Sequence, residues 1–204
     1  MRIFVIFGVG GHALSIADLL ANIEDSAVFF CTEQEGMPVP KGFEQIPLSQ
    51  LMANPKNFEV VLGVGESEVR AKIIKLLAGL DCYFPIVVHP RAYVSNSATI
   101  GPGTVVFSNS YIGPDVHIGD FVIINTNTIV EHNAYVSNSV ILSPSVTLAG
   151  SSAVGEGTFI GMGTCVSAKV QIGDHCVIGA NSFVNSHIPS YSKAFGTPAK
   201  VSIK

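Results

Sequence analysis

The sequence predicts a small α/β domain followed by a larger all-β domain, a parallel β-helix. Strand, glycine-turn and helix patterns alternate over residues 1–88. Every sixth residue from Val94 to Val184 is Ile, Val or Leu, without a skip or an insertion. Small residues and glycines recur in fixed slots between these aliphatic residues, as the corners of a coiled chain require. We therefore expect one domain over residues 1–88 and a second over residues 89–204.

The first domain is expected to be a doubly wound, Rossmann-like α/β unit. Its first strand, Arg2–Phe7, is a continuous apolar run, which is typical of a buried parallel strand. Further helices and strands are expected in alternation, at Ala13–Asn22, Ala27–Phe30, Pro47–Met52, Glu59–Leu62, Ser67–Leu80 and Cys82–Val88.

The hexad repeat sets the size of the second domain. One aliphatic residue in each hexad points into a narrow prism and stacks on its counterparts in the coils above and below. Three hexads in each coil give about five coils and a prism about 25 Å tall.

The composition excludes several classes of function. Hydrophobic residues make up 48% of the chain and charged residues 13%, as in a globular protein. The net charge of −4 gives no support to a nucleic-acid partner, and no apolar run approaches the length of a membrane span. The chain opens on a strand rather than a targeting segment, so we expect a cytoplasmic protein. No metal is expected, because the cysteines show no paired metal spacing and are interpreted as reduced packing residues: Cys31, Cys82, Cys165 and Cys176.

A glycine turn, residues 8–13, follows the first strand and begins the first helix. Glycines there let a ligand approach the backbone, and a helix N-terminus attracts phosphate. An NAD site would also require an acid after the second strand, where only Glu33 is available. A tight turn without a ligand is the alternative interpretation.

The hexad repeat is broken at one chemically distinctive place. The slot after each inward aliphatic residue is small almost everywhere, apart from Phe107 and Glu131, and Glu131 is followed by His132. A charged pair that breaks a structural repeat is a candidate active site. Histidine suits a general base because its ordinary pKa lies near neutral pH. The alternative is a solvated corner with no catalytic role.

With these motifs, the chain resembles the left-handed β-helix acyltransferases. The nearest resemblance is to the branch that acetylates bacterial surface sugars, which includes the nucleotide-amino-sugar N-acetyltransferases and the sialic acid O-acetyltransferases. It rests on the hexads and on residues 122–132, which are similar to the family's strand leading to its catalytic histidine. The resemblance implies a left-handed coil, a homotrimer with active sites between neighbouring subunits, and acetyl-CoA as co-substrate.

The resemblance also implies roles for individual residues. His132 is expected to be the catalytic base, with Glu131 as a nearby carboxylate. Several relatives have an acid directly after the histidine, where this chain has Asn133. Some relatives have a second histidine nine residues further on, where this chain has Ile141. The substrate-binding positions implied for the nucleotide-linked sugar are Gly10, Gly11, His12 and Gly63. The cofactor-binding positions implied for acetyl-CoA are Gly150, Met162, Ala180 and Lys200.

Three functions are compatible with these observations. The first is N-acetylation of a nucleotide-linked 4-amino-4,6-dideoxy sugar for a bacterial surface polysaccharide, by direct transfer from acetyl-CoA. The second is O-acetylation of sialic acid. The third is a β-helical binding or scaffold protein without turnover, which the additional α/β domain disfavours.

Overall fold

Two units make up the chain, Met1–Pro85 and Ile86–Lys204. The computed structural model describes residues 1–21, 23–34 and 36–202. Asn22, the expected end of the first helix, and the last two residues of the second unit lie outside these ranges. None of the helices in these ranges has the length and apolar character needed to cross a bilayer.

The first unit is built on a parallel four-stranded sheet with the strand order β3-β2-β1-β4. Its elements are β1 (Arg2–Phe7), α1 (Gly11–Leu20), β2 (Ser26–Cys31), β3 (Glu44–Gln45), α2 (Leu48–Ala53), the 3-10 helix η1 (Pro55–Asn57), β4 (Glu59–Leu62) and α3 (Ser67–Leu77). The chain adds β2 and β3 on one side of β1 and then β4 on the other. In such a sheet the reversal creates a crevice at the carboxyl ends of the strands, where ligands bind. The predicted Rossmann-like fold is therefore confirmed.

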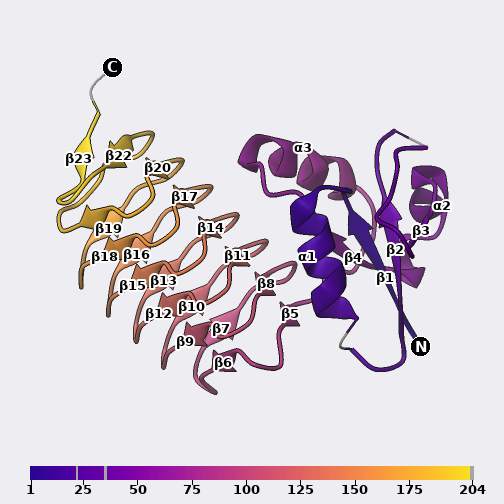
Figure 1. Cartoon of the computed structure of the whole chain (residues 1–204), viewed down its shortest axis with the longest axis horizontal. Coiled ribbons are helices and arrows are strands. Elements are labelled where there is room, and N and C mark those ends of the chain that lie inside the picture. The colour runs from indigo at the N-terminus through magenta and orange to yellow at the C-terminus, as the bar shows by residue number, and fades with distance from the viewer. Residues whose placement is uncertain (22, 35, 203–204) are drawn as a thin grey trace. The chain divides into compact units, whose positions relative to one another are not determined.

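The second unit coils through three sheets, which are parallel apart from the antiparallel pair β22 and β23 at the C-terminal end (Figure 1). The eight-stranded face contains β5 (Val87–Val88), β8 (Val105–Val106), β11 (Ile123–Ile124), β14 (Ile141–Leu142), β17 (Phe159–Ile160), β20 (Val177–Ile178), β22 (Lys193–Phe195) and β23 (Lys200–Val201). The six-stranded face contains β6 (Tyr93–Val94), β9 (Tyr111–Ile112), β12 (Ile129–Val130), β15 (Thr147–Leu148), β18 (Cys165–Val166) and β21 (Phe183–Val184). The five-stranded face contains β7 (Thr99–Ile100), β10 (His117–Ile118), β13 (Tyr135–Val136), β16 (Ala153–Val154) and β19 (Gln171–Ile172).

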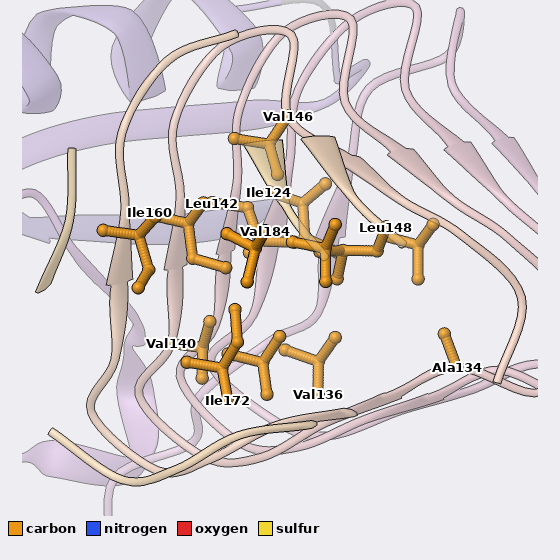
Figure 2. Close-up of a cluster of buried hydrophobic side chains, with 14 of the residues drawn as sticks. Ile124, Ala134, Val136, Val140, Leu142, Val146, Leu148, Ile160, Ile172 and Val184 are labelled. Carbon is orange, nitrogen blue, oxygen red and sulfur yellow. The ribbon is translucent and has the colours of Figure 1, made fainter. Parts of the chain in front are cut away.

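The hexad sets the register of this coil. Each strand from β5 to β18 pairs with the strand 18 residues later, as Ile124 does with Leu142, whereas β20 pairs with β22 after 16 residues. The hexad aliphatic residues from Ile112 to Val184 are almost completely buried. Figure 2 shows these side chains converging from the three faces into one apolar stack. The predicted parallel β-helix is therefore confirmed.

Polar residues at fixed positions of the hexad stabilise the corners through hydrogen bonds and through their backbone conformation. Thr104 is completely buried, and its hydroxyl donates to the Gly119 carbonyl at 2.9 Å while accepting the Val122 amide at 3.0 Å. The third residue of most corners has a left-handed backbone, which Asn, Asp and Gly tolerate best. Asn, Asp, Ser and Gly therefore fill this position at most corners, although Phe121, Lys169 and His175 also adopt the left-handed conformation.

One strand differs from the expectation. Val87 and Val88 were expected to end the α/β domain, but they pair in parallel with Val105 and Val106 as the first rung of the eight-stranded face. The physical reason is that Val88 lies six residues before Val94, so the aliphatic series extends one hexad further toward the N-terminus than expected, and Val87 and Val88 form a strand of the coil.

Candidate active site

His132 lies on an exposed corner between β12 and β13. We call residues 131–134 the His132 corner; here the chain turns from the six-stranded to the five-stranded face. The corner is anchored to the next coil, because the Glu131 amide donates to the Leu148 carbonyl at 2.9 Å. The imidazole is therefore exposed to solvent on a rigid backbone.

Asn133 orients the His132 ring. The distance from His132 Nδ1 to Asn133 Oδ1 is 2.9 Å. An amide oxygen only accepts, so Nδ1 donates and Nε2 keeps its lone pair. The φ of Asn133 is 57°, a left-handed conformation in which asparagine is enriched. Asparagine at position 133 therefore both adopts the left-handed backbone of the corner and accepts the hydrogen bond that orients the imidazole.

Gly150 lies directly above the ring, one coil later. The two corners are joined by a hydrogen bond from the Ser151 amide to the His132 carbonyl, 2.9 Å long. A Cβ on Gly150 would lie 2.6 Å from both Cε1 and Nε2 of His132. The Gly150 N–H has no hydrogen-bond partner among the residues that the structure describes. The absence of a side chain therefore leaves room for the ring and leaves an N–H donor available.

Other residues predicted for catalysis and coenzyme binding lie apart from this pair. Within the described ranges, no ion pair or hydrogen bond joins Glu131 to His132, so Asn133 alone takes the orienting role. Met162 and Ala180 lie on the corner between the eight-stranded and six-stranded faces, at the other edge of the six-stranded face. Lys200 begins β23. The structure thus brings Gly150 to His132 but does not bring the remaining predicted cofactor-binding residues there.

The first unit has its own crevice, about 450 Å³ in volume, at the carboxyl ends of β1, β2 and β4. Gly8 and Val9 line it after β1, and Thr32 and Glu33 line it after β2. Lys72 of α3 adds a positive charge. Sequence reasoning missed Lys72, because nothing in a helix pattern distinguishes a lysine beside a crevice from a solvated one.

The glycines predicted for substrate binding divide into two groups. Gly10 and Gly11 are exposed at the N-terminus of α1, and a Cβ on either would meet nothing within 4 Å. Gly63 is buried, and a Cβ there would lie 2.6 Å from Ile6 Cγ2 and 2.7 Å from Ala13 Cβ. Gly63 therefore lets β4 pack closely against β1 and α1, and its neighbour Val64 lines the crevice.

His12 and Arg70 stabilise the polar edge of this unit. Arg70 is buried, and its Nη1 donates to the carbonyls of Leu62 at 3.3 Å and Val64 at 3.0 Å, which fixes the turn after β4. Burial lowers the pKa of Arg70 to about 10. Burial, with the nearby charge of Arg70, lowers the pKa of His12 to about 4. His12 is therefore neutral at pH 7 and can donate or accept a hydrogen bond.

The low pKa of His12 predicts a loss of stability in acid. Above pH 6.5 the ring is neutral in both the folded and the unfolded state, so it contributes no pH dependence. Between pH 6.5 and 4 the unfolded state binds the proton first, so the free energy of unfolding falls with pH by roughly 3 kcal/mol in total. We expect urea denaturation of wild type and His12→Asn to show a larger loss in the wild type. Equal losses in the two proteins would contradict the assignment.

No three His, Cys, Asp or Glu side chains in the described part of the chain are placed to hold a metal ion.

Comparisons with known proteins identify both units. The family model for the PglD N-terminal domain matches residues 4–77, and the model for the bacterial transferase hexapeptide (six repeats) matches residues 151–186. No curated protein sequence matches the chain.

Solved structures resemble nearly the whole chain. The acetyltransferase domain of PglB from Neisseria gonorrhoeae is 30% identical with a TM-score of 0.92, and the match covers 99% of this chain and 100% of that one. It has also been solved in complex with acetyl coenzyme A. The perosamine N-acetyltransferase from Caulobacter crescentus, solved with CoA and GDP-perosamine, is 28% identical, with coverage of 100% and 98% and TM-scores of 0.92 and 0.89 in different structures. WeeI from Acinetobacter baumannii, at 17% identity and a TM-score of 0.75, shares the fold. The chain belongs to the hexapeptide-repeat sugar acetyltransferases with a left-handed β-helix, enzymes that take their acetyl group from acetyl-CoA.

Proposed function

We propose that this enzyme transfers the acetyl group of acetyl-CoA to the amine of a nucleotide-linked 4-amino-4,6-dideoxy sugar for a bacterial surface glycan. The observation that carries this proposal is the His132 corner, where Asn133 Oδ1 lies 2.9 Å from Nδ1 and where Gly150 leaves space beside Nε2 that a Cβ would fill. The Neisseria and Caulobacter relatives, with their acetyl coenzyme A and GDP-perosamine complexes, support an amino-sugar acceptor.

His132 and Gly150 have different roles in the proposed reaction. His132 Nε2 takes a proton from the sugar amine as the amine attacks the thioester carbonyl. The Gly150 N–H stabilises the negative charge that develops on the carbonyl oxygen. The imidazolium then returns its proton to the departing CoA sulfur. The amine bonds directly to the acetyl carbon, so no acyl-enzyme is required.

The first unit is proposed to hold the nucleotide. Its crevice lies where the strand order reverses, and the N-terminus of α1, with Gly10 and Gly11, offers free amides to a diphosphate. Lys72 adds a positive charge for the phosphates, and neutral His12 can hydrogen-bond to the sugar.

The predicted coenzyme contacts call for more than one copy of the chain. Gly150 lies on one edge of the six-stranded face, whereas Met162 and Ala180 lie on the other. An acetyl-CoA molecule that touches both groups would therefore lie between two copies. Lys200 is proposed to meet a coenzyme phosphate.

The six-stranded face is proposed as the centre of a homotrimer. Its outward side chains are mostly apolar: Tyr93, Tyr111, Ile129, Thr147, Cys165 and Phe183. The rings of Tyr93 and Tyr111 stack with centroids 5.2 Å apart, and Tyr93 and Phe183 are 58% and 40% exposed. A continuous apolar ladder on a flat face suits burial where copies meet around a three-fold axis.

Cys165 provides a direct test of this interface. The thiol lies on the proposed three-fold face and is exposed, whereas Cys31 and Cys176 are buried. We expect a short bismaleimide to cross-link two protomers of the native protein through Cys165, giving a dimer band in denaturing gels. The Cys165→Ser variant should lose that band and remain a trimer by light scattering. A monomeric native protein, or cross-linking unchanged in Cys165→Ser, would contradict the interface.

The proposed reaction is tested by thiol release. We expect the protein with acetyl-CoA to release free CoA when GDP- or UDP-linked 4-amino-4,6-dideoxyhexose is added, and mass spectrometry to find the acetyl group on the sugar nitrogen. Sialic acid should release none. Release with sialic acid alone would overturn the assignment in favour of O-acetylation. If no acceptor causes release of free CoA, and calorimetry shows no binding of acetyl-CoA, the proposal that the protein is an enzyme would be overturned.

A further inference from the structure

Glu131 is the only charged residue on the described outer side of the six-stranded face. Its amide still belongs to the ladder of that face, because it donates to the Leu148 carbonyl at 2.9 Å. Side chains alternate between the two sides of a strand, so Glu131 lies on the same outer side as Ile129, whereas Val130 is buried in the prism. The carboxylate therefore leaves the chain toward the proposed three-fold face and not toward the imidazole of His132.

The position of Glu131 recurs once in every coil, directly after the inward aliphatic residue. Its neighbours in register are small, with Gly113 one coil below and Ala149 one coil above. Glu131 is half-buried, and none of the residues that the structure describes forms a hydrogen bond or an ion pair with its carboxylate. A carboxylate on an apolar face is unfavourable to bury without hydrogen-bond donors. Where copies of the chain meet at this face, the donors must come from the partner subunit.

Symmetry limits which residues of a partner subunit can reach Glu131. In a trimer with cyclic symmetry all copies lie at the same height along the axis, so a coil meets the same coil of its neighbour. In the coil of Glu131, the other edge of the six-stranded face is the corner that precedes β12. Thr126 and Asn127 are exposed on that corner, and both carry hydrogen-bond donors. Asn127 Nδ2 donates one hydrogen to the Ser145 hydroxyl at 3.2 Å, which leaves its second hydrogen for another acceptor.

The sequence offers this carboxylate no cation. No lysine or arginine occurs between Arg91 and Lys169, so the coil of Glu131 and the coils directly above and below it have none. Every copy has the same sequence, so the hydroxyl of Thr126 and the amide of Asn127 remain as donors at this height. Hydrogen bonds from neutral donors to a carboxylate are stronger than those between two neutral groups. Such bonds suit a contact that fixes how two copies are aligned.

We propose that Glu131 is a positioning residue whose carboxylate accepts hydrogen bonds from the partner subunit's Thr126 and the partner subunit's Asn127. Because Glu131 directly precedes His132, this contact holds the edge of the partner subunit beside the catalytic base, and the active site is complete only in the assembled trimer. The inference rests on the proposed function, including its homotrimer, and gives Glu131 a role in assembly in place of a contact with the imidazole.

A reciprocal change of charge tests the contact. We expect Glu131→Lys to raise the protein concentration at which half of the trimer dissociates by about tenfold or more, measured by sedimentation, because an ammonium group cannot accept these hydrogen bonds. Asn127→Asp should also weaken the trimer, since it brings two carboxylates together. Aspartate tolerates the left-handed backbone of this corner, where φ is 61°. The double variant pairs an ammonium with a carboxylate and should return to within about threefold of wild type.

Asn109→Asp is the matched control. Asn109 is on the same edge one coil below, with a φ of 58°, and the residue at that height on the opposite edge is Gly113. This variant should dissociate as the wild type does. Acetyl transfer provides the second readout. The specific activity of Glu131→Lys should increase with enzyme concentration as trimers form, and the double variant should lose that dependence.

The outcomes separate this inference from the proposed function. A Glu131→Lys trimer as strong as wild type, or a double variant as weak as Glu131→Lys alone, overturns the contact. A monomeric native protein overturns the proposed trimer together with the contact. A trimer that responds to the charge swap as expected but transfers no acetyl group overturns the proposed reaction and leaves the contact in place.

Discussion

We expect the His132→Ala variant to lose between about 10²- and 10⁴-fold in kcat, the range that general-base catalysis contributes. The ring is exposed, and among the described residues its side chain bonds only to Asn133, so its removal deletes the base and leaves the corner intact. The measurement is thiol release at saturating acetyl-CoA and nucleotide sugar. Calorimetry should show that the affinity for acetyl-CoA is nearly unchanged.

His117→Ala is the matched control for the loss of an exposed imidazole. His117 lies on β10 of the same β-helix and stacks on Tyr135 rather than facing a glycine corner. We expect it to retain kcat within a few-fold. Wild-type turnover by the His132→Ala variant would remove His132 from the mechanism.

Gly150→Ala is the second variant with a large expected effect. Its Cβ would lie 2.6 Å from His132 Nε2, closer than non-bonded atoms approach, so the imidazole must move. A displacement of about 1 Å in a catalytic group costs on the order of 100-fold in rate. We therefore expect kcat to fall about 100-fold, with no comparable loss of thermal stability.

The backbone itself accepts a side chain at this corner position. One coil above Gly150 the same position is occupied by Ala168, and two coils below by Pro114. The φ of Gly150 also lies outside the left-handed region. Loss of activity in Gly150→Ala would therefore report on the ring and not on strain. Ala168→Gly, the matched control, should keep wild-type turnover, and full activity in Gly150→Ala would show that the ring need not occupy its observed place.

The β-helix could be predicted from the sequence because its repeat is one-dimensional. An inward aliphatic residue at every sixth position determines the strand, the corner and the partner 18 residues away, as for Ile124 and Leu142. The α/β unit was predicted from strand and helix patterns, but Val87 and Val88 were assigned to it as well. Two valines fit either a parallel sheet or a rung of the coil, and the position of Val88, six residues before Val94, already favours the coil that the pairing shows.

The site was predicted less completely, because a sequence does not show which way a side chain points. His132 was predicted because it follows Glu131, the only charged residue at the hexad position directly after the inward aliphatic residue. The sequence could not show that Asn133, whose corner needs a left-handed residue, is the group that bonds to the imidazole.

The most direct test is a crystal structure of the enzyme with CoA and the nucleotide-linked amino sugar bound together. We expect the sugar nitrogen within about 3.2 Å of His132 Nε2, on the side of the ring that faces Gly150. A complex in which the nitrogen meets another base, while His132 faces only solvent, would contradict it.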